Sequence, residues 1–217
     1  MNGRVERLGP LAGIVAVALF VLGVFLFESV AGPPGDDASP QEYLAYYRDE
    51  SSAILWAGVA FQLGAAFFLW FLGSLRARLA EAEGPLSRLT ATAFGGGIAA
   101  STCALLLPGA DMAGALSEEQ LTPDAAVVFN NLGNAFFLGA EYASAVLVAA
   151  AGLVFLSTRL LPRWLGWVSL ALALVLLIGP IGWAGLLFGM PLWTIAVSLL
   201  LFLRPSPVVL PPPTTVP

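Results

Sequence analysis

The chain has 217 residues, of which 59% are apolar and only 11% are charged, and its mean hydropathy is +0.87. A soluble domain carries far more surface charge, so the composition excludes the soluble classes and predicts one integral membrane bundle in contact with lipid. The net charge is −5, and neither histidine nor lysine occurs. These absences exclude histidine metal clusters, histidine bases and lysine Schiff bases, and no basic surface for nucleic acid is present.

Six apolar runs divide the chain, and each is close to the roughly 20 residues that cross about 30 Å of hydrocarbon as a helix. We expect spans at approximately 11–29, 53–75, 89–107, 124–157, 164–179 and 183–203. The predicted fold is therefore all-α, a polytopic transmembrane bundle of six spans over residues 1–204. A disordered, proline-rich cytoplasmic tail is predicted for residues 205–217.

The arginines are distributed unequally between the two sides of this arrangement. Eight of the nine fall on the side of the N-terminus, and only Arg48 falls on the other. The eight are Arg4, Arg7, Arg76, Arg78, Arg88, Arg159, Arg163 and Arg204. An excess of arginine beside span ends marks the cytoplasmic side, so we expect a multi-pass plasma-membrane protein with both termini in the cytoplasm.

The first span has a second interpretation as a signal peptide. Ser29-Val30-Ala31 has small residues where a signal peptidase cleaves, and cleavage of residues 1–31 would leave five spans and an external N-terminus. The apolar run is longer than a usual signal core, and five more spans follow it. We expect it to be retained as an anchor.

The first external loop, at about 30–52, contains a predicted short helix. Ser39-Pro40-Gln41-Glu42 is a capping box with proline at the first helical position. Tyrosines then recur at helical spacing, which favours a helix at the lipid headgroups over a receptor-like binding face. The next helix is predicted to continue through Glu81 and to end before Gly84.

Small residues dominate the third span. Gly95-Gly96-Gly97 let helix backbones approach closely in lipid, which favours helix packing and makes a homo-oligomer through this span plausible. An unwound, ligand-coordinating stretch is the alternative. Pro108-Gly109 is predicted to end the span, with an external loop at about 108–122.

The second half of the chain begins with a long predicted helix. Thr122-Pro123 caps it, and it extends to about Thr158, so it must tilt or project beyond the bilayer. The last two spans are predicted to be joined by an external turn at Gly179–Gly182, because the residue before Pro180 avoids helical geometry. A kink is expected at Pro191.

One acid lies deep in a span and defines the candidate site. Glu141 is predicted near the bilayer midplane, where a charged side chain costs about 2.5–3.5 kcal/mol. No basic residue exists at that depth, so we expect a protonated acid. The candidate polar network consists of Glu141, Asn130, Asn134, Gln62, Ser101 and Thr102, of which Asn130, Asn134 and Glu141 share one helical stripe. A polar pin between helices is favoured over a proton or cation site.

The inventory of side chains gives no support for catalysis. No Ser–His or Ser–Lys pair, metal-ligand spacing or phosphate-binding glycine loop is present in the sequence. We therefore expect a structural or interaction role, no enzymatic activity and no cofactor. The alternative is a small-molecule or proton-coupled transporter that uses Glu141 with the Asn130 and Asn134 stripe.

Several segments resemble a known group of proteins. The segments are Arg7-Leu8-Gly9-Pro10-Leu11-Ala12-Gly13, Glu42-Tyr43-Leu44-Ala45-Tyr46-Tyr47, Leu72-Gly73-Ser74-Leu75-Arg76 and Leu161-Pro162-Arg163-Trp164-Leu165-Gly166-Trp167. Together they resemble a broad group of uncharacterised, mostly actinobacterial, six-helix integral membrane proteins. The resemblance implies a bundle in a bacterial inner membrane. It implies no activity and no functional residue.

Overall fold

The computed structural model describes residues 8–28, 34–35 and 37–204, and within them every regular element is helical. The N-terminal half contains the short 3₁₀ turn η1 (Gly9–Leu11) and the helices α2 (Ala12–Glu28), α3 (Pro40–Asp49), α4 (Ser51–Glu83) and α5 (Arg88–Leu116). The C-terminal half contains α6 (Pro123–Thr158), α7 (Arg163–Leu177), α8 (Gly179–Ala184), the π-helical segment η2 (Gly185–Gly189) and α9 (Met190–Leu203).

Five helical stretches are long and apolar enough to cross a membrane. They are Gly9–Glu28, Ser51–Glu83, Arg88–Leu116, Pro123–Thr158 and Gly179–Leu203. The apolar helix α7 is shorter, at 15 residues. By length and hydropathy the chain is a multi-pass helical membrane protein embedded in the bilayer.

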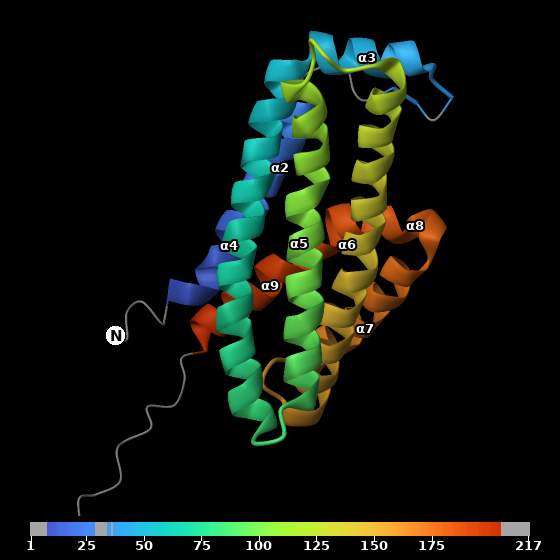
Figure 1. Ribbon diagram of the computed structural model, residues 1–217. Helices are drawn as coiled ribbons and strands as arrows, with labels where there is room; N and C mark the ends of the chain where they lie inside the picture. Colours follow the sequence, from blue (N-terminus) through green and yellow to red (C-terminus); the bar gives the residue numbers. More distant parts are fainter. Residues whose placement is uncertain (1–7, 29–33, 36, 205–217) are drawn as a thin grey trace, which may run out of the picture.

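The long helices α4, α5 and α6 stand side by side and form the centre of the molecule, and α3 lies across one end of them (Figure 1). Close backbone approach holds the centre together. A Cβ added at Gly96 of α5 would lie 2.8 Å from the Leu147 nitrogen of α6, and one at Gly97 would lie 2.6 Å from a Leu72 methyl of α4. Gly96 and Gly97 therefore pack against neighbouring helices of the same chain, as the sequence predicted, whereas Gly95 is exposed.

Helix α2 packs along α4, where Gly64 is next to the Phe20 ring. The start of α2 also contacts α9, because a Cβ at Gly13 would collide with Ser198. The N-terminal helix and the C-terminal helix therefore meet at the same part of the bundle, and Figure 1 shows η1 close to the end of α9.

The C-terminal hairpin packs on α6 and α4. Gly152 of α6 and Gly166 of α7 allow these two helices to touch, and Trp193 of α9 donates a hydrogen bond from Nε1 to Ser169 Oγ of α7 at 2.8 Å. The Trp193 ring also meets Phe71 of α4 edge-on. These buried contacts fix the hairpin against α6 and α4.

The height of this hairpin differs from the sequence prediction. Its tip, where α7 ends and α8 begins, lies beside Glu141, which is the nineteenth of the 36 residues of α6. The tip is thus at the middle of α6 and not at the end where α3 lies (Figure 1). Sequence periodicity gives helix lengths but not the relative heights of packed helices, which explains the difference.

The predicted end of the third span is wrong. Helix α5 does not end at Pro108 but continues to Leu116, so the predicted span 89–107 and the loop at 108–122 must be corrected. A proline inside an apolar helix is tolerated when neighbours satisfy the disturbed turn. Pro108 removes the helical donor to the Ala104 carbonyl, and Gln62 of α4 donates to the adjacent Leu105 carbonyl at 3.4 Å.

Helix α3 forms as predicted, but its tyrosines face the bundle. The capping box between Ser39 and Glu42 is present, with Pro40 in the first turn. Tyr43, Tyr46 and Tyr47 are buried against the ends of α4, α5 and α6 and do not form an open aromatic face. The predicted tail at 205–217, the cleavage pattern at 29–31, Arg4 and Arg7 lie outside the described residues.

Candidate functional site

Glu141 is almost completely buried, with 1% of its surface exposed. Its Oε2 atom has no hydrogen-bond partner among the described residues. The carboxyl group faces α8, because a Cβ added at Gly182 would lie 2.7 Å from Oε2. Only a glycine leaves room for the acid at this point, so the acid and the start of α8 are matched in shape.

The backbone opposite Glu141 is irregular. Helix α7 ends at Leu177, Ile178 is extended with φ −94° and ψ 96°, and α8 restarts at Gly179-Pro180. The last carbonyl groups of a helix have no intrahelical partner, and the Leu176 oxygen is one of them. It lies 3.1 Å from the Cβ position of Gly182, so it faces the same point as the Glu141 carboxyl. The site therefore joins a buried acid to the broken end of a helix.

The asparagines of the predicted stripe do not share this environment. Asn134 is exposed and Asn130 is half-buried, whereas Glu141 is buried. They lie about two and three turns from Glu141 toward the α3 end of α6. The stripe thus passes from the outer surface of the bundle into a packed seam.

The remaining residues of the predicted network bond elsewhere. Ser101 and Thr102 donate to the carbonyls of Gly97 and Ile98 in their own helix, each at 2.9 Å. Gln62 donates to Leu105, next to the proline-disturbed turn of α5. Of the six predicted residues, the structure therefore leaves Glu141 as the centre of a site and gives the three polar residues of α4 and α5 local bonds.

A second polar cluster lies at the α3 end, and the sequence analysis missed it. The hydroxyl of Tyr47 donates to Asp111 Oδ1 at 2.9 Å, and Asp111 in turn faces Gly133 of α6. Burial raises the pKa of Tyr47, and the nearby Asp111 carboxylate raises it further. The error came from placing Asp111 in a loop after Pro108. Cys103, Leu107 and Asp111 recur every fourth residue, and this helical spacing was the available signal that α5 continues past Pro108.

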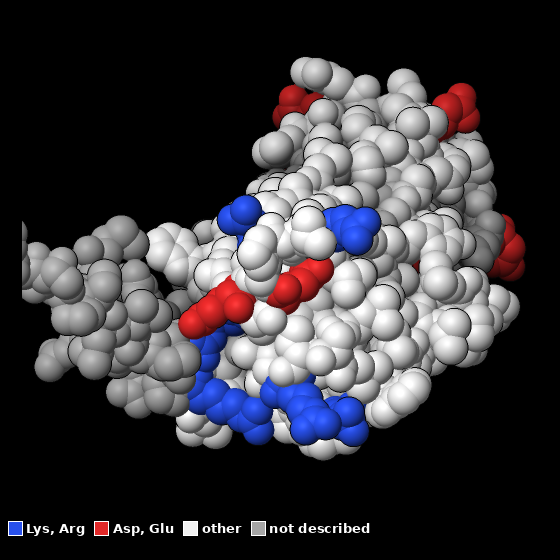
Figure 2. Space-filling view, turned by 90° about the horizontal axis from the view of Figure 1, so that it is seen from below, with Lys and Arg blue, Asp and Glu red and all other residues white. Residues whose placement is uncertain are grey.

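The opposite end of the bundle carries the described arginines other than Arg48. Arg88 and Arg163 begin α5 and α7, while Arg159 and Arg204 cap the ends of α6 and α9. Figure 2, seen from this end, shows arginine side chains around it with acidic side chains between them. Arg48 lies at the α3 end, where it donates to the Glu118 carbonyl at 3.0 Å.

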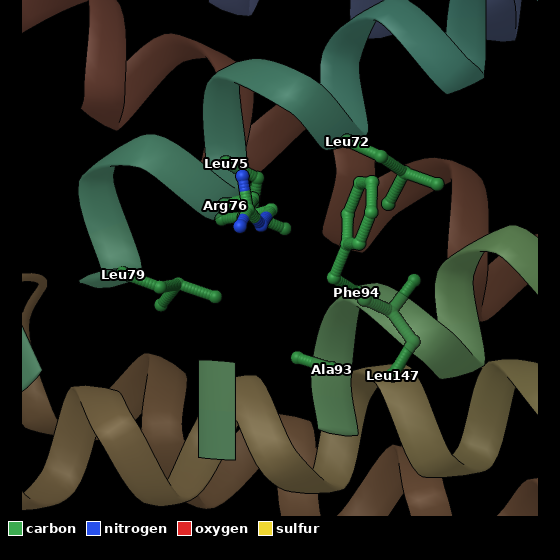
Figure 3. A pocket seen from close by; sticks show the side chains of 7 residues that line it. All are labelled: Leu72, Leu75, Arg76, Leu79, Ala93, Phe94 and Leu147. Atoms are coloured by element: carbon green, nitrogen blue, oxygen red, sulfur yellow. The ribbon is translucent and has the colours of Figure 1, made fainter. Parts of the chain in front are cut away.

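Figure 3 shows a small apolar groove between α4, α5 and α6 near the arginine-bearing end. It is lined by Leu72, Leu75, Arg76, Leu79, Ala93, Phe94 and Leu147. The Arg76 guanidinium lies over the Phe94 ring at 5.2 Å. Side chains fill this groove almost completely, so it is not a cavity of the roughly 300–1,000 Å³ that ordinary small-molecule sites have.

Within the described residues, no group of three or more acidic or cysteine side chains is placed to hold a metal ion. The free thiol of Cys103 faces Gly139 of α6 and is half-buried. No family model, curated protein or solved structure matches the chain.

Proposed function

We propose that this protein is a six-span membrane protein with a structural or interaction role and with both termini in the cytoplasm. The arginine-bearing end supports this orientation, because arginine beside span ends is retained on the cytoplasmic side. Six of the nine arginines are at that end of the described structure.

The C-terminal hairpin supports the count of six crossings. Gly179–Leu203 is an apolar stretch of 25 residues, which is long enough to cross the bilayer. The apolar helix α7 extends from the arginine-bearing end to the tip of the same hairpin, and its 15 residues span about 22 Å at 1.5 Å per residue. We therefore count α7 as the sixth crossing.

The observation that carries the interaction role is a row of small residues on the outer face of α5. Ala91, Gly95 and Ala99 are exposed and recur every fourth residue, whereas the neighbouring Gly96 and Gly97 are buried inside the chain. Rows of small residues at this spacing bring transmembrane helices into close contact. The outer row is free to receive a helix of a second copy of the chain, and the inner pair is not.

The test replaces one glycine on this face by a large residue. Gly95→Leu should abolish self-association measured by cross-linking in liposomes, because a leucine keeps the two backbones apart. Gly73→Leu is the matched control, since Gly73 is an exposed glycine of α4 with nothing within 4 Å of its Cβ position. Equal association of both variants, or none in the unmodified protein, would exclude this face as the contact.

The proposal also states that the protein is not an enzyme. Its support is the absence of histidine and lysine from the whole sequence, which leaves no Ser–His or Ser–Lys pair. Purified protein should show no reproducible turnover of hydrolase or transferase substrates. Turnover that is lost on a single substitution would refute this part of the proposal.

A further inference from the structure

We propose that Glu141 and the broken helix between α7 and α8 form a proton-binding site inside the bundle. The inference is independent of the self-association face, because Glu141 lies on α6 and Gly95 lies on α5. The two proposals can therefore fail separately.

The burial of Glu141 determines its protonation state. Glu141 is 1% exposed, and its Oε2 has no hydrogen-bond partner among the described residues. A carboxylate buried without a partner is very costly, so the group takes up a proton instead. A protonated carboxyl has one O–H to donate, and it needs an acceptor within reach.

The broken helix supplies a hydrogen-bond acceptor for the protonated acid. The Glu141 Oε2 and the Leu176 carbonyl oxygen lie 2.7 and 3.1 Å from the same point, the Cβ position of Gly182, so they are at most 5.8 Å apart. Leu176 is in the last turn of α7, where carbonyl groups lack intrahelical donors. This carbonyl is therefore the acceptor that we propose for the protonated carboxyl of Glu141.

The number of oxygen ligands decides which cation the site can bind. A metal cation such as Na⁺ needs several oxygen ligands, and the carboxyl and one carbonyl are too few. Apart from Tyr142, the nearest titratable groups on the packed elements are Cys103 of α5, which faces Gly139, and Asp111, which faces Gly133. Residues 164–203 carry no charged side chain at all. The proton is the cation that this site can hold.

The segment opposite Glu141, α8 with η2, can change its conformation. Gly179, Gly182, Gly185 and Gly189 fall within eleven residues, and η2 is a π-helical segment, which often marks a functional position. A protonated Glu141 stabilises the closed tip through the Leu176 carbonyl. An ionised Glu141 requires water, so loss of the proton should open the tip at α8.

Infrared spectroscopy of the purified protein in liposomes tests this directly. The carbonyl band of a protonated carboxylic acid should be present near neutral pH and should disappear reversibly as the pH is raised. The contribution of Glu141 is the difference between the unmodified protein and Glu141→Gln, which keeps the shape of the side chain and cannot titrate, because the other acids of the chain contribute equally to both spectra. A band from Glu141 that never changes with pH, or no such band, would overturn the proposal.

A pair of glycine variants tests the geometry without removing the acid. Gly182→Ala places a methyl group 2.7 Å from Oε2 and should shift the pH at which the band disappears. Gly179→Ala is the matched control, because its Cβ position has nothing within 4 Å, and it should leave the titration unchanged. Identical titrations of the two variants would refute the site, and loss of the band on adding Na⁺ at constant pH would assign it to a metal cation.

Discussion

Single glycines decide how closely the helices of this bundle approach. Gly96 and Gly152 each have a backbone atom of the neighbouring helix within 3.0 Å of their Cβ position. Gly95 and Gly73 have nothing within 4 Å. Some glycines therefore allow two helices to touch and others lie on an open surface, and only the residues opposite them distinguish the two cases.

The adjacent glycines of α5 give the sharpest residue-scale prediction. Gly96→Ala should destabilise the fold by about 1–3 kcal/mol, because its methyl group would meet the Leu147 nitrogen and the Ala143 carbonyl of α6. Gly95→Ala should have little effect, since its Cβ position is open. Unfolding in mixed detergent micelles measures both, and equal losses of stability would contradict the packing of α5 on α6.

The capping box of α3 gives a prediction about pH. Hydrogen bonds from the backbone and the side chain of Ser39 lower the pKa of Glu42 in the folded chain. A lowered pKa means that the stabilisation is fully present above the ordinary pKa of glutamate, about 4.3, and is lost as the pH falls through the folded value. We expect the first turn of α3 to loosen in acid.

The check compares proteolysis of the loop before α3 at neutral and at acid pH, using an acid-tolerant protease. Cleavage should increase in acid for the unmodified protein. Glu42→Gln should remove most of this pH dependence, because glutamine at the third position still caps the helix and does not titrate. A similar pH dependence in the variant would assign the effect to another group.

At the scale of elements, α3 acts as a cover on the ends of the central helices. The tyrosines on one side of it are buried, and Tyr47 bonds to Asp111 of α5. The sequence predicted the helix and its first residue, because the capping box is a local signal. It did not predict that the helix rests on α5, because the position of α5's end was misjudged at Pro108.

Removal of one hydroxyl tests this docking. Tyr47→Phe should weaken the attachment of α3 by about 1.5 kcal/mol, because it deletes a hydrogen bond to a carboxylate and leaves Asp111 with one donor fewer. Tyr43→Phe is the control and should cost less, since that hydroxyl donates to the neutral Gly35 carbonyl. Amide hydrogen exchange in α3 measures the difference. A larger effect from Tyr43→Phe would show that Asp111 does not hold the helix.

At the scale of the whole molecule, α6 is longer than the bilayer. Its 36 residues extend about 54 Å at 1.5 Å per residue, against roughly 30 Å of hydrocarbon. Helix α2 covers the half of the bundle nearer α3, and the C-terminal hairpin covers the half nearer the arginines (Figure 1). The central helices must therefore tilt or project from the membrane.

The predicted orientation can be tested by labelling from outside the cell. After Cys103→Ser, single cysteines at Asp37, before α3, and at Glu81, near the end of α4, should differ. A membrane-impermeant thiol reagent should modify only the cysteine at position 37, because the arginine-bearing end is predicted to be cytoplasmic. Modification of position 81 alone would invert the topology, and modification of both would contradict it.

The sequence by itself determined the class of the protein, because hydropathy and local capping signals depend on neighbouring residues only. It gave the bounds of α6 and the start of α3, and it singled out Glu141 as the acid inside a span. The tertiary structure decided the rest: that α5 continues through Pro108, that Asp111 bonds Tyr47, and that Gly182 faces Glu141. The two residue pairs are 64 and 41 residues apart in the sequence, and the period of a helix carries no information about which faces meet at which height.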